Sequence, residues 1–144
     1  MPIHPDLRQH YGRAWREEIR PRILERAGHC CEQCGKPDRW QIATVTMPYW
    51  PRMYWRPFSP AYAPWRNAFG EATVLQFPEK DVRRITVILT VAHLNHIAGD
   101  NRDENLKALC QWCHLHYDHL HHKTSRSTRK DAARPLLAVT QAEL

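Results

Sequence analysis

Two pairs of cysteines carry the clearest chemistry in this chain. Cys31 and Cys34 form one Cys-x2-Cys pair, and Cys110 and Cys113 form a second pair much further along. Four thiolates at this spacing are the ligands of a tetrahedral structural Zn²⁺ site, which leaves no open position for water or substrate. A fifth cysteine, Cys30, is either an alternative first ligand or a free thiol. The cysteines therefore predict a structural zinc ion and do not by themselves predict catalysis.

Residues that activate water and bind metal ions gather around the second cysteine pair. His93 follows an apolar segment, and a neutral imidazole can take a proton from water near neutral pH. His114 and Asp118 are four residues apart, so on a helix they share one face and can bind one divalent ion. Asn105 can hydrogen-bond the backbone of the loop that carries His93 and so orient it. These groups suit phosphodiester hydrolysis by a base and a metal ion.

In the N-terminal part, residue patterns predict a helix and a turn that position the first cysteine pair. Residues 10–28 favour a helix, which Pro21 is expected to kink or restart. Gly28 is expected to end this helix. Residues 31–37 predict a tight turn around the first cysteine pair, in which Gly35 relieves crowding after the second thiolate.

The C-terminal half predicts a strand followed by helices. Residues 85–91 alternate apolar residues with threonine, which indicates a strand with one buried face running into His93. Asp103 is expected to cap a helix that begins at the next residue and is interrupted by the second cysteine pair. A helical run over 112–122 follows, and residues 123–144 form a basic tail, either an arm or a short docking helix.

Residues 38–84 are an insertion between the cysteine pairs and are the least predictable part. Five prolines and seven aromatic residues lie between Pro48 and Trp65, a density that argues against a helix or a central strand. Interleaved arginines and aromatic rings can bind nucleic acid by stacking and phosphate contact. The alternative, which we favour for most of the rings, is burial in a loop folded over the core. These arginines are Arg52, Arg56 and Arg66.

Length and composition narrow the class of protein. A chain of 144 residues predicts a single domain. With 21 basic and 15 acidic side chains the net charge is +6, which suits an anionic partner and equally suits a merely soluble basic protein. An odd number of cysteines argues against a disulfide framework and favours a reducing cytosol. The most apolar segment, 85–92, is too short to span a bilayer, so no membrane association is expected.

The stretch from Val91 to Asp118 resembles the HNH endonuclease family, most of all its small phage and bacterial members with paired Cys-x2-Cys zinc knuckles. It reads Val-Ala-His-Leu-Asn-His-Ile-Ala-Gly-Asp-Asn-Arg-Asp-Glu-Asn-Leu-Lys-Ala-Leu-Cys-Gln-Trp-Cys-His-Leu-His-Tyr-Asp. Residues 31–37 are similar to that family's first knuckle. The resemblance implies an α+β fold with a ββα-metal core over residues 85–122, in which a two-stranded hairpin and a helix hold one catalytic ion.

The resemblance also implies a role for individual residues. The matched positions are the general base His93, the loop-holding Asn105 and the metal ligand His114. Asp118 lies where some members have a further ligand. The family usually has an aspartate or histidine just before the base, where this chain has Ala92, and His96 is our candidate to replace that ligand. Arg102, beside this loop, is a candidate for binding the scissile phosphate. The alternative, which we weight equally, is that Arg102 is merely an exposed turn residue.

We therefore predict a single-domain endonuclease that hydrolyses DNA, in preference to RNA, with a structural Zn²⁺ and one catalytic Mg²⁺, Mn²⁺ or other first-row ion. The rival interpretation, favoured by Ala92, is a non-catalytic zinc-stabilised module that binds nucleic acid or a protein partner. A third is a structural subunit whose proline–aromatic insertion docks onto a larger assembly. The expected location is the cytoplasm of a bacterium or phage-infected host. The sequence predicts no oligomeric state.

Overall fold

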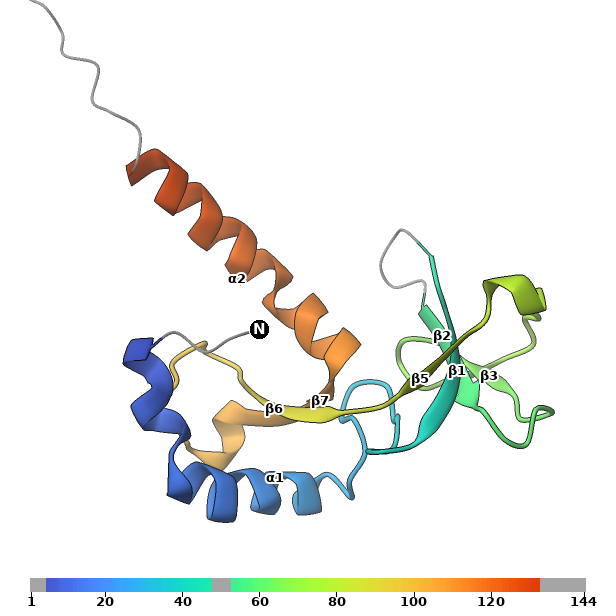
Figure 1. Ribbon diagram of the computed structural model, residues 1–144, viewed down its shortest axis with the longest axis horizontal. Coiled ribbons are helices and arrows are strands. Elements are labelled where there is room, and N and C mark those ends of the chain that lie inside the picture. The colour runs from blue at the N-terminus through green and yellow to red at the C-terminus, as the bar shows by residue number, and fades with distance from the viewer. Residues whose placement is uncertain (1–4, 48–52, 133–144) are drawn as a thin grey trace, which may run out of the picture. The chain divides into compact units, whose positions relative to one another are not determined.

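In chain order, helical segments come first and last in the described residues and the strands of two antiparallel sheets come between them, as the colours of Figure 1 show. The fold is therefore mixed α+β, as predicted. The structure, a computed structural model, describes residues 5–47 and 53–132, without the side chains of 120, 122 and 125–132. The chain divides into two compact units, one ending at His114 and the other beginning at Leu115. No helix within the described ranges is long and apolar enough to cross a membrane.

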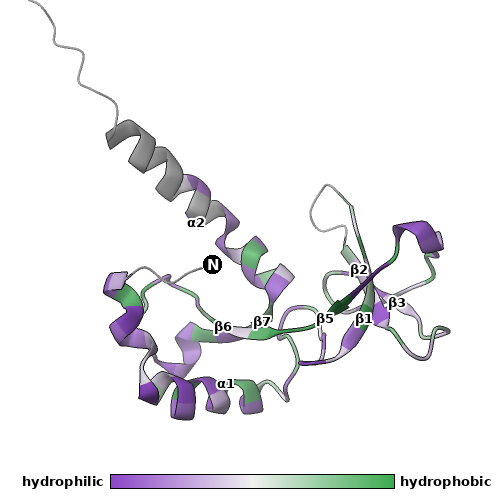
Figure 2. Ribbon diagram, viewed as in Figure 1, coloured by the Kyte–Doolittle hydropathy of each residue, from purple (hydrophilic) through white to green (hydrophobic). Residues whose placement is uncertain are grey.

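The N-terminal helical segment has three parts. They are a 3-10 helix, Pro5–Tyr11, a π-helical turn, Trp15–Ile19, and α1, Arg20–Arg26. Pro21 lacks an N–H and its ring crowds the preceding turn, so the wider π-helical turn lies just before it. α1 buries Ile23 and Leu24, and Figure 2 shows its mixture of hydrophilic and hydrophobic residues. Gly28, with a φ of 60°, follows the helix end, which confirms the predicted stop.

The insertion forms a five-stranded antiparallel sheet, whose last strand ends just beyond residue 84. Its strand order is β4-β3-β2-β1-β5. The strands are β1 (Gln41–Thr46), β2 (Met53–Pro57), β3 (Trp65–Arg66), β4 (Ala72–Thr73) and β5 (Arg83–Thr86), and a 3-10 helix, Glu79–Asp81, precedes β5. β2 is the middle strand, so the expectation that prolines exclude a central strand was wrong. Pro57 is the last residue of β2, and residues 53–56 contain no proline and keep every backbone donor.

The aromatic residues of the insertion divide between burial and exposure. Trp55 and Trp65 are each only 4% exposed, as expected of rings that stabilise a core. Tyr62 is 89% exposed and Phe58 is 40% exposed, so burial does not extend to these two rings. Two further rings considered in the sequence, Tyr49 and Trp50, lie outside the described residues, as does Arg52.

The second sheet is a hairpin of β6 (Leu89–His93) and β7 (Leu106–Cys110), and α2 (Gln111–Ala132) follows β7 directly. The register runs from Leu89 opposite Cys110 to His93 opposite Leu106. The helix expected to begin after Asp103 was wrong: a 3-10 turn, Asp103–Asn105, leads into β7 instead. Pairing with β6 satisfies the backbone of β7 and buries Leu106 in the core, which outweighs local helix propensity.

The strand expected over 85–91 is divided between the two sheets, because β5 and β6 are separated by Val87 and Ile88. The side chain of Gln111 bridges the gap: it donates to the Thr86 carbonyl at 3.0 Å and accepts from the Ile88 N–H at 3.1 Å. The predicted alternation is confirmed for residues 87, 89 and 91, which are buried, whereas Ile85 is only half-buried.

The main hydrophobic core joins α1 to the β6–β7 hairpin (Figure 1). α1 contributes Ile23 and Leu24, and the hairpin contributes Leu89, Val91 and Leu106, among other residues. The four cysteines of the two Cys-x2-Cys pairs belong to this same core. The candidate metal centre is therefore inside the fold rather than at its surface.

Candidate metal centre and histidine loop

The four paired cysteines form one buried group. Their Sγ atoms all lie within 4.8 Å of one another, and the Cys34 and Cys110 sulfur atoms are 3.7 Å apart. Zn–S bonds of about 2.3 Å at tetrahedral angles would separate sulfur atoms by about 3.8 Å. No cysteine of the group is more than 3% exposed. The group can therefore hold a structural metal ion, and Cys30, the alternative ligand, is not part of it.

Glu32 joins the first cysteine turn to β7 and so brings the distant pairs together. Its N–H donates to the Ala108 carbonyl at 2.9 Å, and its carboxylate accepts from the Ala108 N–H at 2.6 Å. Arg26 of α1 donates to this carboxylate at 3.2 Å and to the Leu106 carbonyl at 2.6 Å. The helix, the turn and the strand are thus locked around the cysteines by charge-assisted hydrogen bonds.

Two glycines allow the chain to approach the first cysteine pair closely. Gly35 has a φ of 74° and donates its N–H to the Cys31 carbonyl at 2.8 Å, which confirms the predicted tight turn. Gly70, in the insertion, has a φ of 84°, and a Cβ there would lie 3.0 Å from the Cys34 carbonyl oxygen. A side chain at position 70 would therefore push the insertion away from the cysteine turn.

Four thiols this close together cannot all be thiolates unless a cation neutralises them. A hydrogen bond with Cys113 holds the pKa of Cys110 below its usual value, at about 7, and one with Cys110 lowers the pKa of Cys31. Hydrogen bonds with Cys110 raise the pKa of Cys34 and of Cys113. A metal ion that binds the group must displace the protons held by these last two residues.

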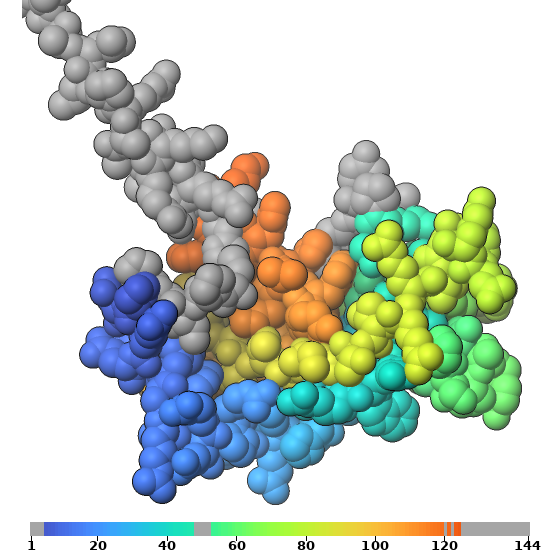
Figure 3. Space-filling model, in the orientation of Figure 1, coloured from blue at the N-terminus to red at the C-terminus, as the bar shows by residue number. Residues whose placement is uncertain are grey.

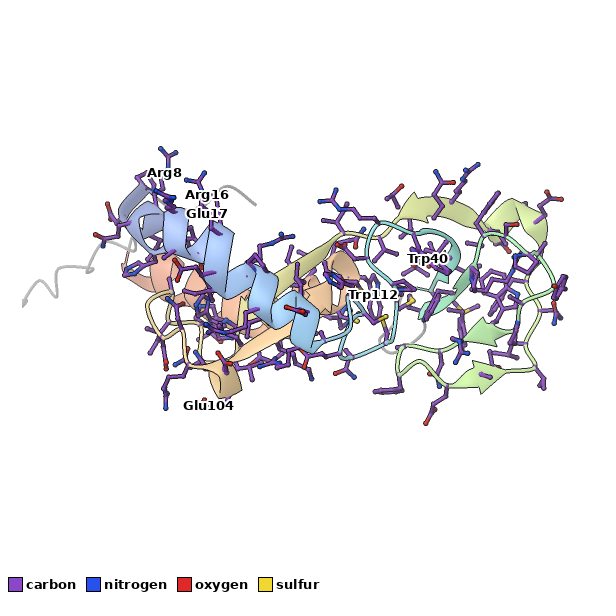
Figure 4. The ribbon with its side chains drawn as sticks, turned by 90° about the horizontal axis from the view of Figure 1, so that it is seen from below. Arg8, Arg16, Glu17, Trp40, Glu104 and Trp112 are labelled. Atoms are coloured by element: carbon purple, nitrogen blue, oxygen red, sulfur yellow. The ribbon has the colours of Figure 1, made fainter. Side chains whose placement is uncertain are left out.

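Lys36 lies beside this group and is only 2% exposed. Its ammonium Nζ is 3.2 Å from the Met53 Sδ and 5.8 Å from the ring centre of Trp112, which packs against the core that holds the cysteines (Figure 4). A buried ammonium group is costly unless a negative charge compensates it. After the Cys113 hydrogen bond, the charge of Lys36 is a further cause of the lowered pKa of Cys110. A thiolate at Cys110 would therefore compensate the charge of Lys36.

His93 ends β6 as predicted and is only 7% exposed. Its ring stacks on Trp15, with ring centres 5.0 Å apart and an angle of 19° between planes, and the edge of Tyr11 is near the same ring. Its Nε2 lies 3.0 Å from the Asn101 Oδ1. Since an amide oxygen only accepts, Nε2 carries the proton in this pair and the acceptor lone pair is on Nδ1.

Asn105, also 7% exposed, holds the loop that follows His93. Its Oδ1 accepts from the Asn95 N–H at 3.0 Å, and its Nδ2 donates to the Asp100 carbonyl at 2.8 Å and to the Asn95 Oδ1 at 2.9 Å. Its own carbonyl accepts from the Leu94 N–H at 2.8 Å. One side chain thus fixes both ends of the loop between β6 and the 3-10 turn.

His114 lies in the first turn of α2, half-buried, with its Nδ1 2.6 Å from the Thr90 Oγ1. The Thr90 hydroxyl donates its single proton to the Leu109 carbonyl at 3.2 Å, so it accepts from His114 Nδ1–H. This tautomer puts the metal-binding lone pair of His114 on Nε2. Ala92, 1% exposed, is two residues from Thr90 and so lies on the same face of β6.

The remaining predicted site residues have different surroundings. Arg102 forms a two-pronged ion pair with Asp100, at 2.8 and 2.7 Å, which holds the pKa of Asp100 near 2 and raises that of Arg102. His96 is exposed in the loop, with a φ of 58°, and its N–H donates to the His93 carbonyl at 3.1 Å. Asp118 lies on α2 beyond the boundary between the two compact units.

Comparisons of the chain with known protein families, with curated proteins and with solved structures found no match. Four residues that shape the two sites were not picked out as site residues from the sequence: Trp15, Lys36, Thr90 and Asn101. Each interacts with a site residue that is distant in the chain or lies at the other end of a loop, and no local sequence pattern indicates such an interaction. The position of Lys36 directly after the first cysteine turn was the only available signal.

Proposed function

We propose that the protein is a metal-dependent endonuclease of the HNH type that hydrolyses DNA phosphodiester bonds. The observation that supports this most is the arrangement of three residues on one hairpin and the helix that follows it. His93 ends β6, Asn105 holds the loop before β7, and His114 begins α2. We take β6, β7 and the start of α2 as the ββα-metal core implied by the resemblance.

In this proposal His93 is the general base. Asn101 holds the Nε2 proton and Trp15 fixes the plane of the ring, so Nδ1 is the atom that accepts a proton from water. The loop that Asn105 holds keeps His93 in this orientation. A base whose ring cannot rotate loses little entropy in the transition state.

His114, through Nε2, is the proposed ligand of a catalytic Mg²⁺, Mn²⁺ or other first-row ion, with Asp118 and His96 as further candidates. Thr90 accepts a hydrogen bond from His114 and so orients its ring, as hydrogen-bond partners of metal-binding histidines commonly do. Such an ion stabilises charge on the phosphate and on the leaving oxygen. The four cysteines hold a separate ion, which we propose to be Zn²⁺, with a structural role.

The test is cleavage of supercoiled plasmid by the purified protein with Mg²⁺, Mn²⁺ or EDTA, comparing wild type with His93→Gln. Glutamine can still donate to Asn101, so this variant keeps the loop bond and loses the basic nitrogen. We expect metal-dependent nicking by wild type and a loss of roughly a hundredfold or more in the variant. His29→Asn, at an exposed position with a φ of 53°, is the matched control and should cut like wild type.

The second candidate is a non-catalytic, zinc-stabilised module that binds nucleic acid or a protein. Ala92 favours it, because a buried methyl group stands where HNH enzymes usually have a ligand. This candidate predicts no cleavage with any metal ion by a protein that retains its cysteine-bound ion. That result would overturn the nuclease proposal, and cleavage that survives in His93→Gln would overturn the role of His93.

A further inference from the structure

Two arginines lie on one face of the five-stranded sheet, on either side of its β1 strand. Ala43 of β1 is paired with Arg56 of β2 on one side and with Arg84 of β5 on the other. Residues in register across neighbouring strands point to the same face, so the two arginines flank Ala43 with their Cα atoms about 10 Å apart. Ala43 itself is fully buried.

An aromatic ring supports each of these two guanidinium groups. The Arg84 Cζ lies 4.2 Å from the ring centre of Phe58, and the Arg56 Cζ lies 5.1 Å from that of Trp65. Stacking fixes the plane of a guanidinium group and leaves its N–H edge for acceptors in that plane. The rings therefore position both arginines before any ligand binds, which reduces the entropy lost on binding.

The charges of the two arginines are not neutralised within the described residues. Arg84 donates to the Gln41 Oε1 and Arg56 donates to the Pro57 carbonyl at 3.1 Å, and neither has a carboxylate partner there. Arg84 and Gln41 are exposed, Phe58 is 40% exposed, and Figure 3 shows β5 at the molecular surface. Two guanidinium groups that lack carboxylate partners among the described residues and are held in place by aromatic rings are suited to binding phosphate groups, as is the net charge of +6.

We propose that Arg56, Arg84 and Phe58 form a DNA-binding surface on the insertion, separate from the histidine loop, that contacts the phosphodiester backbone. The choice of DNA rests on the proposed function. The surface would contact phosphates, and phosphate contacts carry no information on base sequence. It would hold the substrate for hydrolysis by the site proposed at His93 and His114.

The test is fluorescence anisotropy of a labelled DNA duplex titrated with zinc-loaded protein, without added Mg²⁺ or Mn²⁺, at several salt concentrations. In the double variant Arg56→Gln/Arg84→Gln we expect binding at 0.1 M salt to weaken roughly tenfold, and the slope of log K against log salt to fall by about 1.8, since two phosphate contacts are lost. Phe58→Leu keeps the charge and removes one ring, so it should weaken binding by a smaller factor. Circular dichroism and metal content verify that each variant folds.

The matched control is Arg8→Gln/Arg16→Gln, which removes the same charge from exposed residues that extend from the N-terminal helical segment (Figure 4). A control that lowers the slope as much as the double variant would show that net charge, not this surface, binds DNA. Unchanged binding by the double variant, or no DNA binding by wild type, would also overturn the surface. The same titration is repeated with labelled single-stranded RNA. If the double variant weakens binding to RNA and leaves binding to DNA unchanged, the choice of DNA would be overturned.

These outcomes are independent of the test of the proposed function. Binding without added Mg²⁺ or Mn²⁺ requires no cleavage, so a protein that binds DNA through this surface without nicking plasmid would retain the surface and lose the nuclease proposal. If wild type nicks plasmid and the double variant binds DNA as tightly as wild type, the nuclease proposal would stand and the proposed surface would be overturned.

Discussion

Lys36 has one of the largest fully buried side chains in the described part of the protein, and its charge contributes to the lowered pKa of Cys110. A metal ion bound by four thiolates carries a net charge of −2, so the ammonium group stabilises the loaded centre. In the metal-free protein, replacing Lys36 by an apolar residue should increase stability, because the cost of burying an ammonium group is avoided.

We therefore expect Lys36→Met to release zinc to a chelator roughly 10 to 100 times faster than wild type, which is typical of losing an outer partner of a metal site. Release is followed with a chromogenic zinc indicator. The same variant should raise the thermal midpoint of the metal-free protein. Lys80→Met, at an exposed position in the insertion, is the control. Equal release rates for Lys36→Met and wild type would mean that Lys36 only fills space.

At the scale of elements, Glu32 is the connection between the first cysteine turn, α1 and β7. Glu32→Ala leaves the Ala108 N–H without its side-chain acceptor and removes the partner of Arg26. We expect this variant to lower the free energy of unfolding by about 1–3 kcal/mol, measured by urea denaturation of the metal-loaded protein. Glu17→Ala, which breaks an exposed pair with Arg13, should cost less than about 1 kcal/mol. A similar cost for both variants would argue against a special role for Glu32.

Elements set by local residue chemistry could be predicted, and elements set by distant pairing could not. The stop at Gly28, the tight turn at Gly35 and the alternation before His93 depend on a few adjacent residues, and all three are present. β7 was expected to be a helix because its strand character depends on pairing with β6. β2 was missed because prolines near a strand look the same in a sequence as prolines within it.

The same distinction applies to the candidate sites. The Cys-x2-Cys spacing sufficed to predict the four-cysteine group, because each turn brings its own two ligands together. The stacking of Trp15 on His93 and the hydrogen bond from His114 to Thr90 depend on packing between elements. Sequence spacing carries no information on such contacts, and the assigned roles of His93, Asn105 and His114 remain predictions.

At the scale of the molecule, the four-cysteine group lies in the main core, so losing an ion bound there should affect the whole fold. We expect Cys34→Ser to lose the bound ion and to unfold without a cooperative thermal transition, or at a much lower temperature than wild type. Circular dichroism and measurement of bound zinc are the readouts. Cys30→Ser changes a neighbouring cysteine outside the group, so it should retain the ion and unfold like wild type. Equal metal loss in both variants would contradict the ligand assignment.

The chain enters and leaves the five-stranded sheet through residues that hydrogen-bond to one another. The Arg39 N–H donates to the Val87 carbonyl at 2.9 Å, the Val87 N–H donates to the Trp40 carbonyl at 2.8 Å, and the Leu89 N–H donates to Asp38 at 2.8 Å. The distance in space between the two cysteine turns is therefore decoupled from the number of residues between them. Lengthening or shortening the loops between its strands should therefore leave the two cysteine turns in place, whereas Ile42, Met53 and Trp55 of the sheet belong to the same core as the cysteines and are tied to it.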